Sequence, residues 1–331
     1  MNTLVARTGT LLGKAWVRAF IALLLVVLLG VLFNANGSFF KWSTHRDMFR
    51  HISEYGILAC GLTIVIIAAG IDLSVGSVLA CVAVLFSILT IHRGWSPIAS
   101  IPLCLGAGGA CGAVSGWLIA RHKVQPFIAT LAMMVFARGL AKLISGGEKI
   151  STYVQRTDGS FESLPLPGIF RVIDSRLFGD NLAMVTFVFL ACLLATWLLL
   201  EKLVVGRYFY AIGGNEDAAR LSGIPVARAK LLAYGLCGLF SGIAGICHAA
   251  QEMQGDPEAG VTYELTAIAI VVIGGTSLMG GRGSVGLTLL GAVTIGYLEK
   301  ILSINAVGEP ARLMLTGVII VAAVLFQKAK R

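Results

Sequence analysis

The chain has 331 residues, of which 57% are hydrophobic and 13% are charged, and its mean hydropathy is +0.86. A water-soluble domain of this length needs far more polar surface, so the composition excludes one and predicts an integral membrane protein. The net charge of +9 does not indicate nucleic-acid binding, because Lys and Arg lie mostly between the apolar stretches and form no basic stripe with interleaved aromatic residues.

Ten apolar stretches approach the length of about 20 residues that a membrane-spanning helix needs. They lie at residues 17–33, 52–70, 74–92, 98–120, 125–145, 181–200, 230–250, 264–281, 284–300 and 311–327. The first follows basic residues as a signal peptide would, but no A-x-A cleavage site stands out after it, so we interpret it as an uncleaved span. The sequence predicts an all-α integral membrane protein whose residues 1–331 form one transmembrane domain of about ten helices.

The distribution of Lys and Arg predicts the topology. The segments on one side of the ten spans hold more of these residues than the segments on the other side, which places both termini in the cytoplasm. Residues 146–180 then form a periplasmic loop, where several acids accompany Pro165 and Pro167, and we expect it to be exposed with room for a short interfacial helix. Residues 201–230 form a cytoplasmic loop.

A polar sequence interrupts the apolar pattern at residues 70–77, which read Gly-Ile-Asp-Leu-Ser-Val-Gly-Ser. A charge at membrane depth is costly, so either Asp72 or Ser74 caps the next helix, or this break lines a wet pathway. The two interpretations are compatible. A similar pattern, in which an apolar run leads to glycines and a Gly-Ser-Val tripeptide, recurs at residues 270–285 and hints at duplicated halves, as transporters often have.

The glycine-rich segment at residues 274–286 contains a formal GxGxxG, but both flanks have the pattern of membrane helices rather than of a βαβ unit. The segment has no P-loop, so we predict no ATP site and no cofactor. A resemblance of residues 275–278 to the GxSx of intramembrane serine proteases lacks a nearby His, because His248 falls toward the other membrane face. We interpret the segment as a flexible turn in a protein that is not an enzyme.

Glycines recur at helical spacing in two spans and predict close helix packing within the subunit, although a dimer seam would have the same pattern. They are Gly108, Gly112 and Gly116 in the fourth span, and Gly235, Gly238, Gly242 and Gly245 in the seventh. The seven cysteines all lie in apolar stretches without a metal-ligand spacing, so we predict packing thiols and no metal site.

Within the loop at 201–230, the sequence predicts one short, sharply capped helix. Asn215 can accept from the free amides of the first turn, and Glu216 and Asp217 suit the positive end of the helix dipole. Gly223 fits the C′ position and Pro225 prevents continuation. A membrane protein that presents such a helix to water is expected to have a soluble partner.

Three motifs in combination resemble the ribose/xylose/galactose-type sugar permeases of ABC importers, over roughly residues 20–327. They are residues 70–77, the Gln-Pro-Phe-Ile-Ala-Thr-Leu at residues 125–131, and the polar segment at residues 211–224, with the glycine-rich segment at 274–286 in agreement. The resemblance implies the importer bundle of the ribose/branched-chain amino acid type in the bacterial inner membrane. It also implies an ATP-binding cassette ATPase, a periplasmic sugar-binding protein and a second permease subunit, here expected to be identical.

In that family a short coupling helix of the cytoplasmic loop inserts into a cleft of the ATPase, which hydrolyses the ATP. Small Ala218 and Ala219 would let this helix sit deep, and Arg220 would pair with an acid of the ATPase. The expected contact residues are Asn215, Glu216, Ala218, Ala219, Arg220 and Gly223. The expected polar residues of the gate or pathway are Asp72, Ser74, Ser77, Thr276 and Ser277.

An ion-coupled secondary transporter of a small polar solute is the alternative. Such a machine needs ionisable groups deep in the bundle, whereas Glu54, Glu201, Glu264 and Glu299 all fall near the ends of predicted spans. The sequence therefore favours energy supplied from outside the chain. A membrane scaffold without transport would leave the glycine-rich breaks unexplained.

Overall fold

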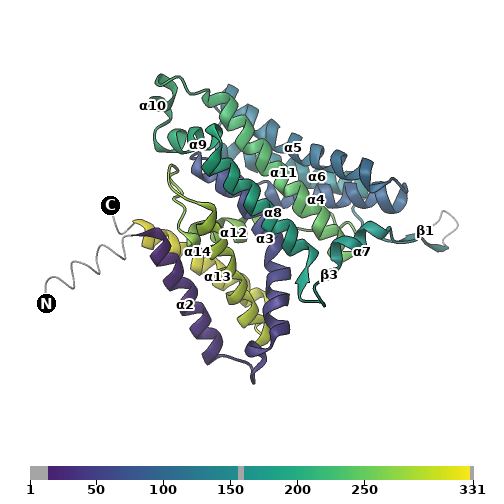
Figure 1. The fold of residues 1–331 in the computed structure, drawn as a ribbon. Coiled ribbons are helices and arrows are strands. Elements are labelled where there is room, and N and C mark those ends of the chain that lie inside the picture. Colours follow the sequence, from purple (N-terminus) through teal and green to yellow (C-terminus); the bar gives the residue numbers. More distant parts are fainter. Residues whose placement is uncertain (1–13, 156–159, 329–331) are drawn as a thin grey trace.

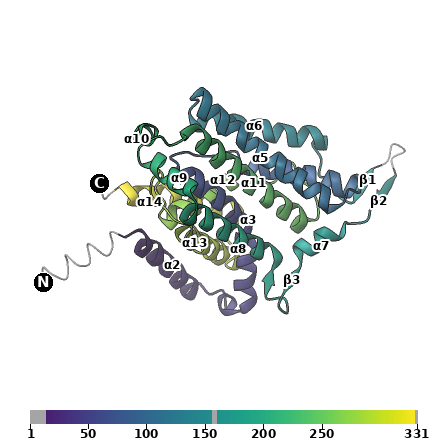
Figure 2. The same ribbon diagram turned by 45° about the horizontal axis from the view of Figure 1, so that its top comes forward.

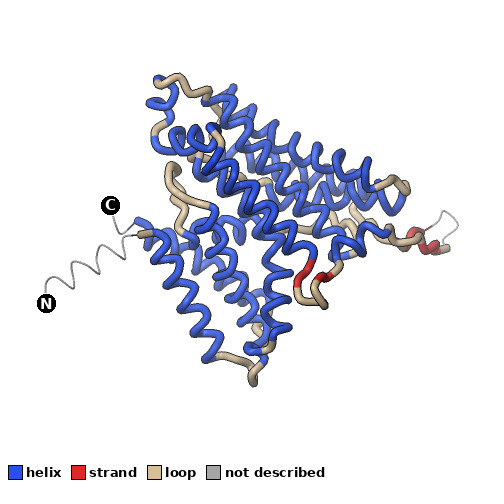
Figure 3. The backbone as a smooth tube through the Cα atoms, in the orientation of Figure 1, coloured by secondary structure: helices blue, strands red, loops and turns tan. Residues whose placement is uncertain are grey.

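The computed structural model describes residues 14–155 and 160–328. Part of the charge bias that places both termini in the cytoplasm falls on residues 1–13 and 329–331, outside the described residues, as do residues 156–159 of the predicted outer loop. The described part is a helical bundle with two short hairpins (Figures 1 and 3).

Eight helical stretches in the described residues are long and apolar enough to cross a membrane. They are α2 (Ala15–Leu32), α3 (Trp42–Ile67), α4 (Val75–Ser87) with the π-helical turn η2 (Ile88–His92), α5 (Pro97–His122), α6 (Pro126–Ser145), α8 (Met184–Trp197) with the π-helical turn η3 (Leu198–Lys202), α11 (Val226–Glu252) and α13 (Val285–Ile304). The remaining helices are η1 (Ser38–Phe40), α7 (Gly168–Asp174), α9 (Val204–Gly214), α10 (Glu216–Leu221), α12 (Tyr263–Gly274) and α14 (Glu309–Lys328).

Each of the ten predicted spans overlaps a helix, but two sets of bounds were wrong. The span expected at 264–281 is the 12-residue α12, which at about 1.5 Å per residue covers little more than half of a bilayer core of about 30 Å. Residues 275–284 are a loop instead. The span expected at 52–70 is α3, which begins ten residues earlier, at Trp42.

The predicted outer loop at 146–180 contains α7, a short helix for which the sequence left room, and most of two antiparallel hairpins that sequence patterns did not indicate. In one hairpin β1 (Tyr153–Gln155) pairs with β2 (Phe161–Ser163), and in the other β3 (Arg176–Leu177) pairs with β4 (Leu182–Ala183). Figures 1 and 2 place the hairpins and α7 on the opposite side of the bundle from α9, α10, the start of α2 and the end of α14.

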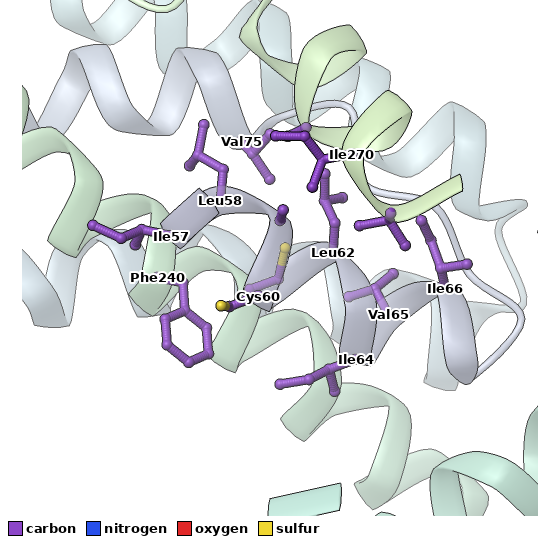
Figure 4. Close-up of a cluster of buried hydrophobic side chains, with 14 of the residues drawn as sticks. Ile57, Leu58, Cys60, Leu62, Ile64, Val65, Ile66, Val75, Phe240 and Ile270 are labelled. Atoms are coloured by element: carbon purple, nitrogen blue, oxygen red, sulfur yellow. The ribbon is translucent and has the colours of Figure 1, made fainter. Parts of the chain in front are cut away.

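Helix α3 runs through the centre of the bundle and is buried almost continuously from Ile52 to Ile67. Its apolar side chains pack against α4, α11 and α12, as Figure 4 shows for Leu62, Phe240 and Ile270. From Ile57 to Ile67 the helix is apolar except for Thr63, as is expected of a segment that is buried on all sides.

Helices α5 and α11 pack closely through their glycines, which confirms the predicted packing within the subunit. A Cβ at Gly112 would collide with the carbonyl oxygen of Tyr234, and Cβ atoms at Gly108 and Gly238 would each collide with the carbonyl oxygen of the other residue. Gly245 lies instead against Leu79 of α4. These small residues let the backbones come within contact distance.

The chain returns into the interior of the bundle at two places. Between α3 and α4, residues 68–74 are non-helical, and Ala68, Asp72 and Ser74 among them are buried. Between α11 and α12, residues 253–262 run back along α4, so that Gly255 lies against Ala83 and Gly260 against Gly76. The N-terminal ends of α4 and α12 therefore meet inside the protein.

Candidate coupling helix and candidate pathway

Helix α10 forms where its sequence signals predict it. The side chain of Asn215 accepts a hydrogen bond from the Ala218 amide at 3.0 Å, which confirms the cap. The helix ends at Leu221, and Gly223 takes the left-handed conformation with a φ of +81° that glycine adopts without strain. The result is a rigid helix of less than two turns at the end of α9.

Glu216 holds α10 against the rest of the subunit. Its carboxylate pairs with Arg220 at 2.7 Å and with Lys230 of α11 at 2.5 Å, and Lys123 lies 4.0 Å away. Partial burial acts to raise the pKa of Glu216, but the hydrogen bond from Lys230 and the charges of Lys230, Lys123 and Arg220 outweigh it and lower the pKa below the usual value for a carboxyl. Glu216 is therefore ionised and anchors the helix.

The two alanines of α10 differ in exposure, and of the two only Ala218 is open to a partner in this structure. Ala219 is only 4% exposed, because it packs into the subunit's own core, so it cannot line a partner's cleft in this conformation. Ala218 is exposed, as are Asn215, Arg220 and Gly223.

Leu221 projects from the end of α10 with 90% of its surface exposed, and sequence analysis missed it. A single exposed leucine is common on protein surfaces, but at the tip of this capped helix it is the apolar side chain most open to a partner of α10. The missed signal was the periodicity of the short helix, because Leu221 follows buried Ala219 by two residues and so falls on the outer face.

The break at residues 70–77 places Asp72 in the core, where it is 1% exposed. Its Oδ1 accepts from the Ser74 amide at 2.9 Å and from the Ser74 hydroxyl at 2.6 Å, in a local side-chain turn. The predicted capping of the next helix was therefore wrong, because neither side chain accepts from the first turn of α4. Asp72 instead stabilises the extended chain before it.

Ser77 is the predicted pathway residue that lines a cavity. Thr276 and Ser277 lie elsewhere, in the loop between α12 and α13, where the Ser277 hydroxyl accepts from the Met279 amide at 3.3 Å. This loop meets the end of α3, since the Gly281 amide donates to the Ile67 carbonyl oxygen at 2.9 Å. The five residues thus divide between two regions.

The expectation that every acid lies near the end of a span was wrong for Glu54. Because α3 begins at Trp42, Glu54 lies near its middle and is buried there. Its Oε2 lies 3.0 Å from Nδ1 of His248, within hydrogen-bond distance. The hydrogen-bond partner of His248 is therefore Glu54 and not Ser277, as a Ser–His catalytic pair would require.

Comparison with known proteins assigns the family. Residues 46–324 match the family described as the permease component of the branched-chain amino acid transport system. The ribose import permease protein RbsC of Escherichia coli (strain K12) is 39% identical over 324 residues, which cover 96% of each chain. The L-arabinose transport system permease protein AraH of the same strain is 36% identical, over 85% of this chain and 82% of AraH.

The fructose import permease protein FrcC of Rhizobium meliloti is 34% identical, over 92% of this chain and 84% of FrcC. No solved structure matches the chain. The family match spans most of the sequence and the relatives cover nearly all of it, in agreement with the helical bundle. The chain therefore belongs to the family of ABC importer permeases that is described as the permease component of branched-chain amino acid transport systems.

Proposed function

We propose that this chain is the permease subunit of an ABC importer that moves a monosaccharide of the pentose or hexose class across the bacterial inner membrane. Its relatives support the sugar class, since they import ribose, arabinose and fructose. The chain performs no hydrolysis itself, and a separate ATP-binding cassette ATPase supplies the energy. A substrate-binding protein delivers the sugar on the outer side.

Helix α10 is the contact through which ATP-driven movement reaches the bundle. Its exposed end, formed by Leu221 with Ala218 and Arg220, is the surface offered to the ATPase. Glu216 and buried Ala219 fix the helix to α11 and the core, so a force on Leu221 passes into α9 and α11 rather than bending a loose loop. The side of the bundle that carries α10, the start of α2 and the end of α14 is then the cytoplasmic side.

Two identical subunits, embedded in lipid, form the complete permease. Val135 on α6 and Val261 beside α12 are exposed next to charged Arg138 and Glu264. Charges so close to lipid are costly, and a second copy over this face would replace lipid by protein around a central path. Movement of α10 would then open this path alternately to the two sides.

Substitution of Leu221 tests the coupling role. Leu221→Asp should reduce sugar uptake at least tenfold and reduce co-purification of the ATPase, because an anchor residue in an interface carries roughly 2 kcal/mol or more. Membrane insertion should stay normal, because the side chain contacts little of its own subunit. Leu221→Met is the matched control, since it keeps an apolar side chain of similar volume, and it should retain uptake.

Vesicles provide the test of the function as a whole. Vesicles that contain the permease, the ATPase and the binding protein should accumulate labelled ribose, arabinose or fructose only when ATP is present on the ATPase side. Accumulation by the permease alone under an ion gradient would favour the secondary transporter instead. Full uptake by Leu221→Asp would refute the coupling surface but leave the importer function standing.

A further inference from the structure

A cavity of about 300 Å³ lies where the N-terminal ends of α4 and α12 meet. Its lining combines four side chains that can bond a polar ligand, Ser77, Arg138, Thr262 and Glu264, with apolar side chains of α6 and of the segment before α12. The volume lies at the lower end of the roughly 300 to 1,000 Å³ typical of sites for small molecules. The cavity is therefore large enough for a small solute.

Ser77 presents a hydroxyl that nothing in the described part of the chain satisfies. The residue is 3% exposed, and its side chain makes no hydrogen bond with another described residue, although serines in helices commonly bond to the carbonyl oxygen four residues earlier. The hydroxyl is not sealed inside the protein but opens onto the cavity. Water or a polar ligand there can therefore bond to it.

Glu264 and Arg138 are both available to a ligand. The Glu264 carboxylate, in the first turn of α12, forms no hydrogen bond or ion pair with another residue of the described ranges. One guanidinium nitrogen of Arg138 donates to the carbonyl oxygens of Pro257 and Ala259, at 2.5 and 2.7 Å, and thereby holds the returning segment in place. Its other donors have no protein partner within residues 14–155 and 160–328.

The glycine contact beside the cavity keeps these groups together. A Cβ at Gly76 would collide with the Gly260 carbonyl oxygen, and a Cβ at Gly260 would come within 2.5 Å of the Gly76 carbonyl oxygen. The two backbones therefore cross at van der Waals distance, and the first turns of α4 and α12 open onto one space. Small movements of either helix end would change the shape of the cavity.

We propose that this cavity binds the hydroxyl groups of the transported sugar as it passes, which rests on the proposed function. Adjacent hydroxyls of a sugar are donors and acceptors at once. Glu264 accepts from one, the free donors of Arg138 bond to the oxygen of its neighbour, and the Ser77 hydroxyl serves either role. The opposite charges of Glu264 and Arg138 disfavour a simple anion or cation, so the cavity suits a neutral polyol best.

Cysteine accessibility tests whether the cavity is wet and on the path. In the complete complex in vesicles, Ser77→Cys should react with a charged methanethiosulfonate reagent, and saturating substrate sugar should slow the reaction at least threefold. Ser115→Cys is the control, because Ser115 is fully buried, its hydroxyl is enclosed without a partner among the described residues, and it does not line this cavity. The unsubstituted chain sets the background of the native cysteines. Equal reactivity of the two variants would refute the proposal.

Transport by Glu264→Gln tests the contact with the sugar. The substitution preserves shape, and it should lower uptake of the accepted sugar at least tenfold while the chain still inserts and co-purifies with the ATPase. For a singly deoxygenated analogue that lacks the contacted hydroxyl, the same substitution should have less than threefold effect. Uptake unchanged for every sugar would overturn the assignment of Glu264.

The outcomes separate this proposal from the proposed function. If the unsubstituted complex transports none of the three labelled sugars, the sugar importer function fails first. If it transports one of them, and Ser77→Cys and Glu264→Gln behave like the controls, only the cavity proposal fails. Transport of a zwitterionic amino acid that depends on Glu264 would overturn the sugar class, because an amino acid could pair its two charges with Arg138 and Glu264.

Discussion

The break between α3 and α4 and the break between α12 and α13 carry the same Gly-Ser-Val tripeptide but use it differently. In the second break Ser284 is the N-cap of α13, and its hydroxyl accepts from the Leu287 amide at 3.4 Å. In the first break α4 begins at Val75, two residues before Ser77, so the serine is already inside the helix and faces the cavity. The place where the helix starts decides the role of the serine.

The glycines of the two tripeptides also have different neighbours. Gly76 crosses Gly260 of the returning segment, whereas its counterpart Gly283 lies against the side chain of Thr276 in its own loop. The first break is therefore fixed by a backbone crossing between distant parts of the chain. The second combines contacts within its own loop with hydrogen bonds from the Tyr210 hydroxyl to the Gly283 carbonyl oxygen and from the Gly281 amide to the Ile67 carbonyl oxygen. Each break also contains a local turn closed by a side chain. The Asp72 carboxylate accepts from the Ser74 amide in the first, and the Ser277 hydroxyl accepts from the Met279 amide in the second.

Replacement of Gly76 and of Gly283 by alanine should give the largest difference in stability between the two breaks. Gly76→Ala should destabilise the protein by about 3 kcal/mol, because overpacking against backbone has no soft neighbour to displace. Gly283→Ala should cost less, about 1 kcal/mol, since a side chain can shift. Thermal unfolding of the purified protein in detergent measures both. In an open helix, Gly to Ala would stabilise instead, so a more stable Gly76→Ala variant would contradict the crossing.

Removal of the two local turns should have a smaller effect. Asp72→Ala should cost about 2 kcal/mol, because it leaves the buried amide and hydroxyl of Ser74 without an acceptor. Asp72→Asn keeps an acceptor oxygen and is the matched control, expected to retain most of the stability. Ser277→Ala should cost less than Asp72→Ala, because the Ser277 bond is longer and its loop is partly exposed. An equal loss for Asp72→Ala and Ser277→Ala would show that burial does not distinguish the two breaks.

Sequence patterns predicted the parts of the molecule whose causes are local. The cap at Asn215, the end of α10 near Gly223 and the glycine faces of α5 and α11 each depend on residues within a few positions, and all are confirmed. The all-α membrane class follows in the same way from apolar composition alone. For such features the chain needs no information from distant segments.

The interior of the bundle could not be predicted from local patterns, because its features depend on which distant segments meet. Hydropathy placed the start of α3 at residue 52, because Arg46 and Arg50 depress the local average, and so placed Glu54 at an end rather than at a buried pair with His248. The apolar pattern likewise ran through the end of α12 at Gly274. The charges of Arg138 and Glu264 are far apart in sequence, and the return of residues 253–262 into the bundle brings them to one cavity.

The two serines provide the smallest and most selective comparison. Ser284→Ala should destabilise the protein by about 1 kcal/mol, because it removes a helix cap. Ser77→Ala should be nearly neutral, because the hydroxyl that it deletes has no partner in the described chain. Unfolding midpoints under one set of detergent conditions measure the pair. Sugar uptake should show the opposite order. Ser77→Ala should lower uptake more than Ser284→Ala, because it removes a group of the proposed sugar site and Ser284→Ala does not. Parallel losses of stability and uptake in Ser77→Ala would indicate that its hydroxyl supports α4 rather than a passing ligand.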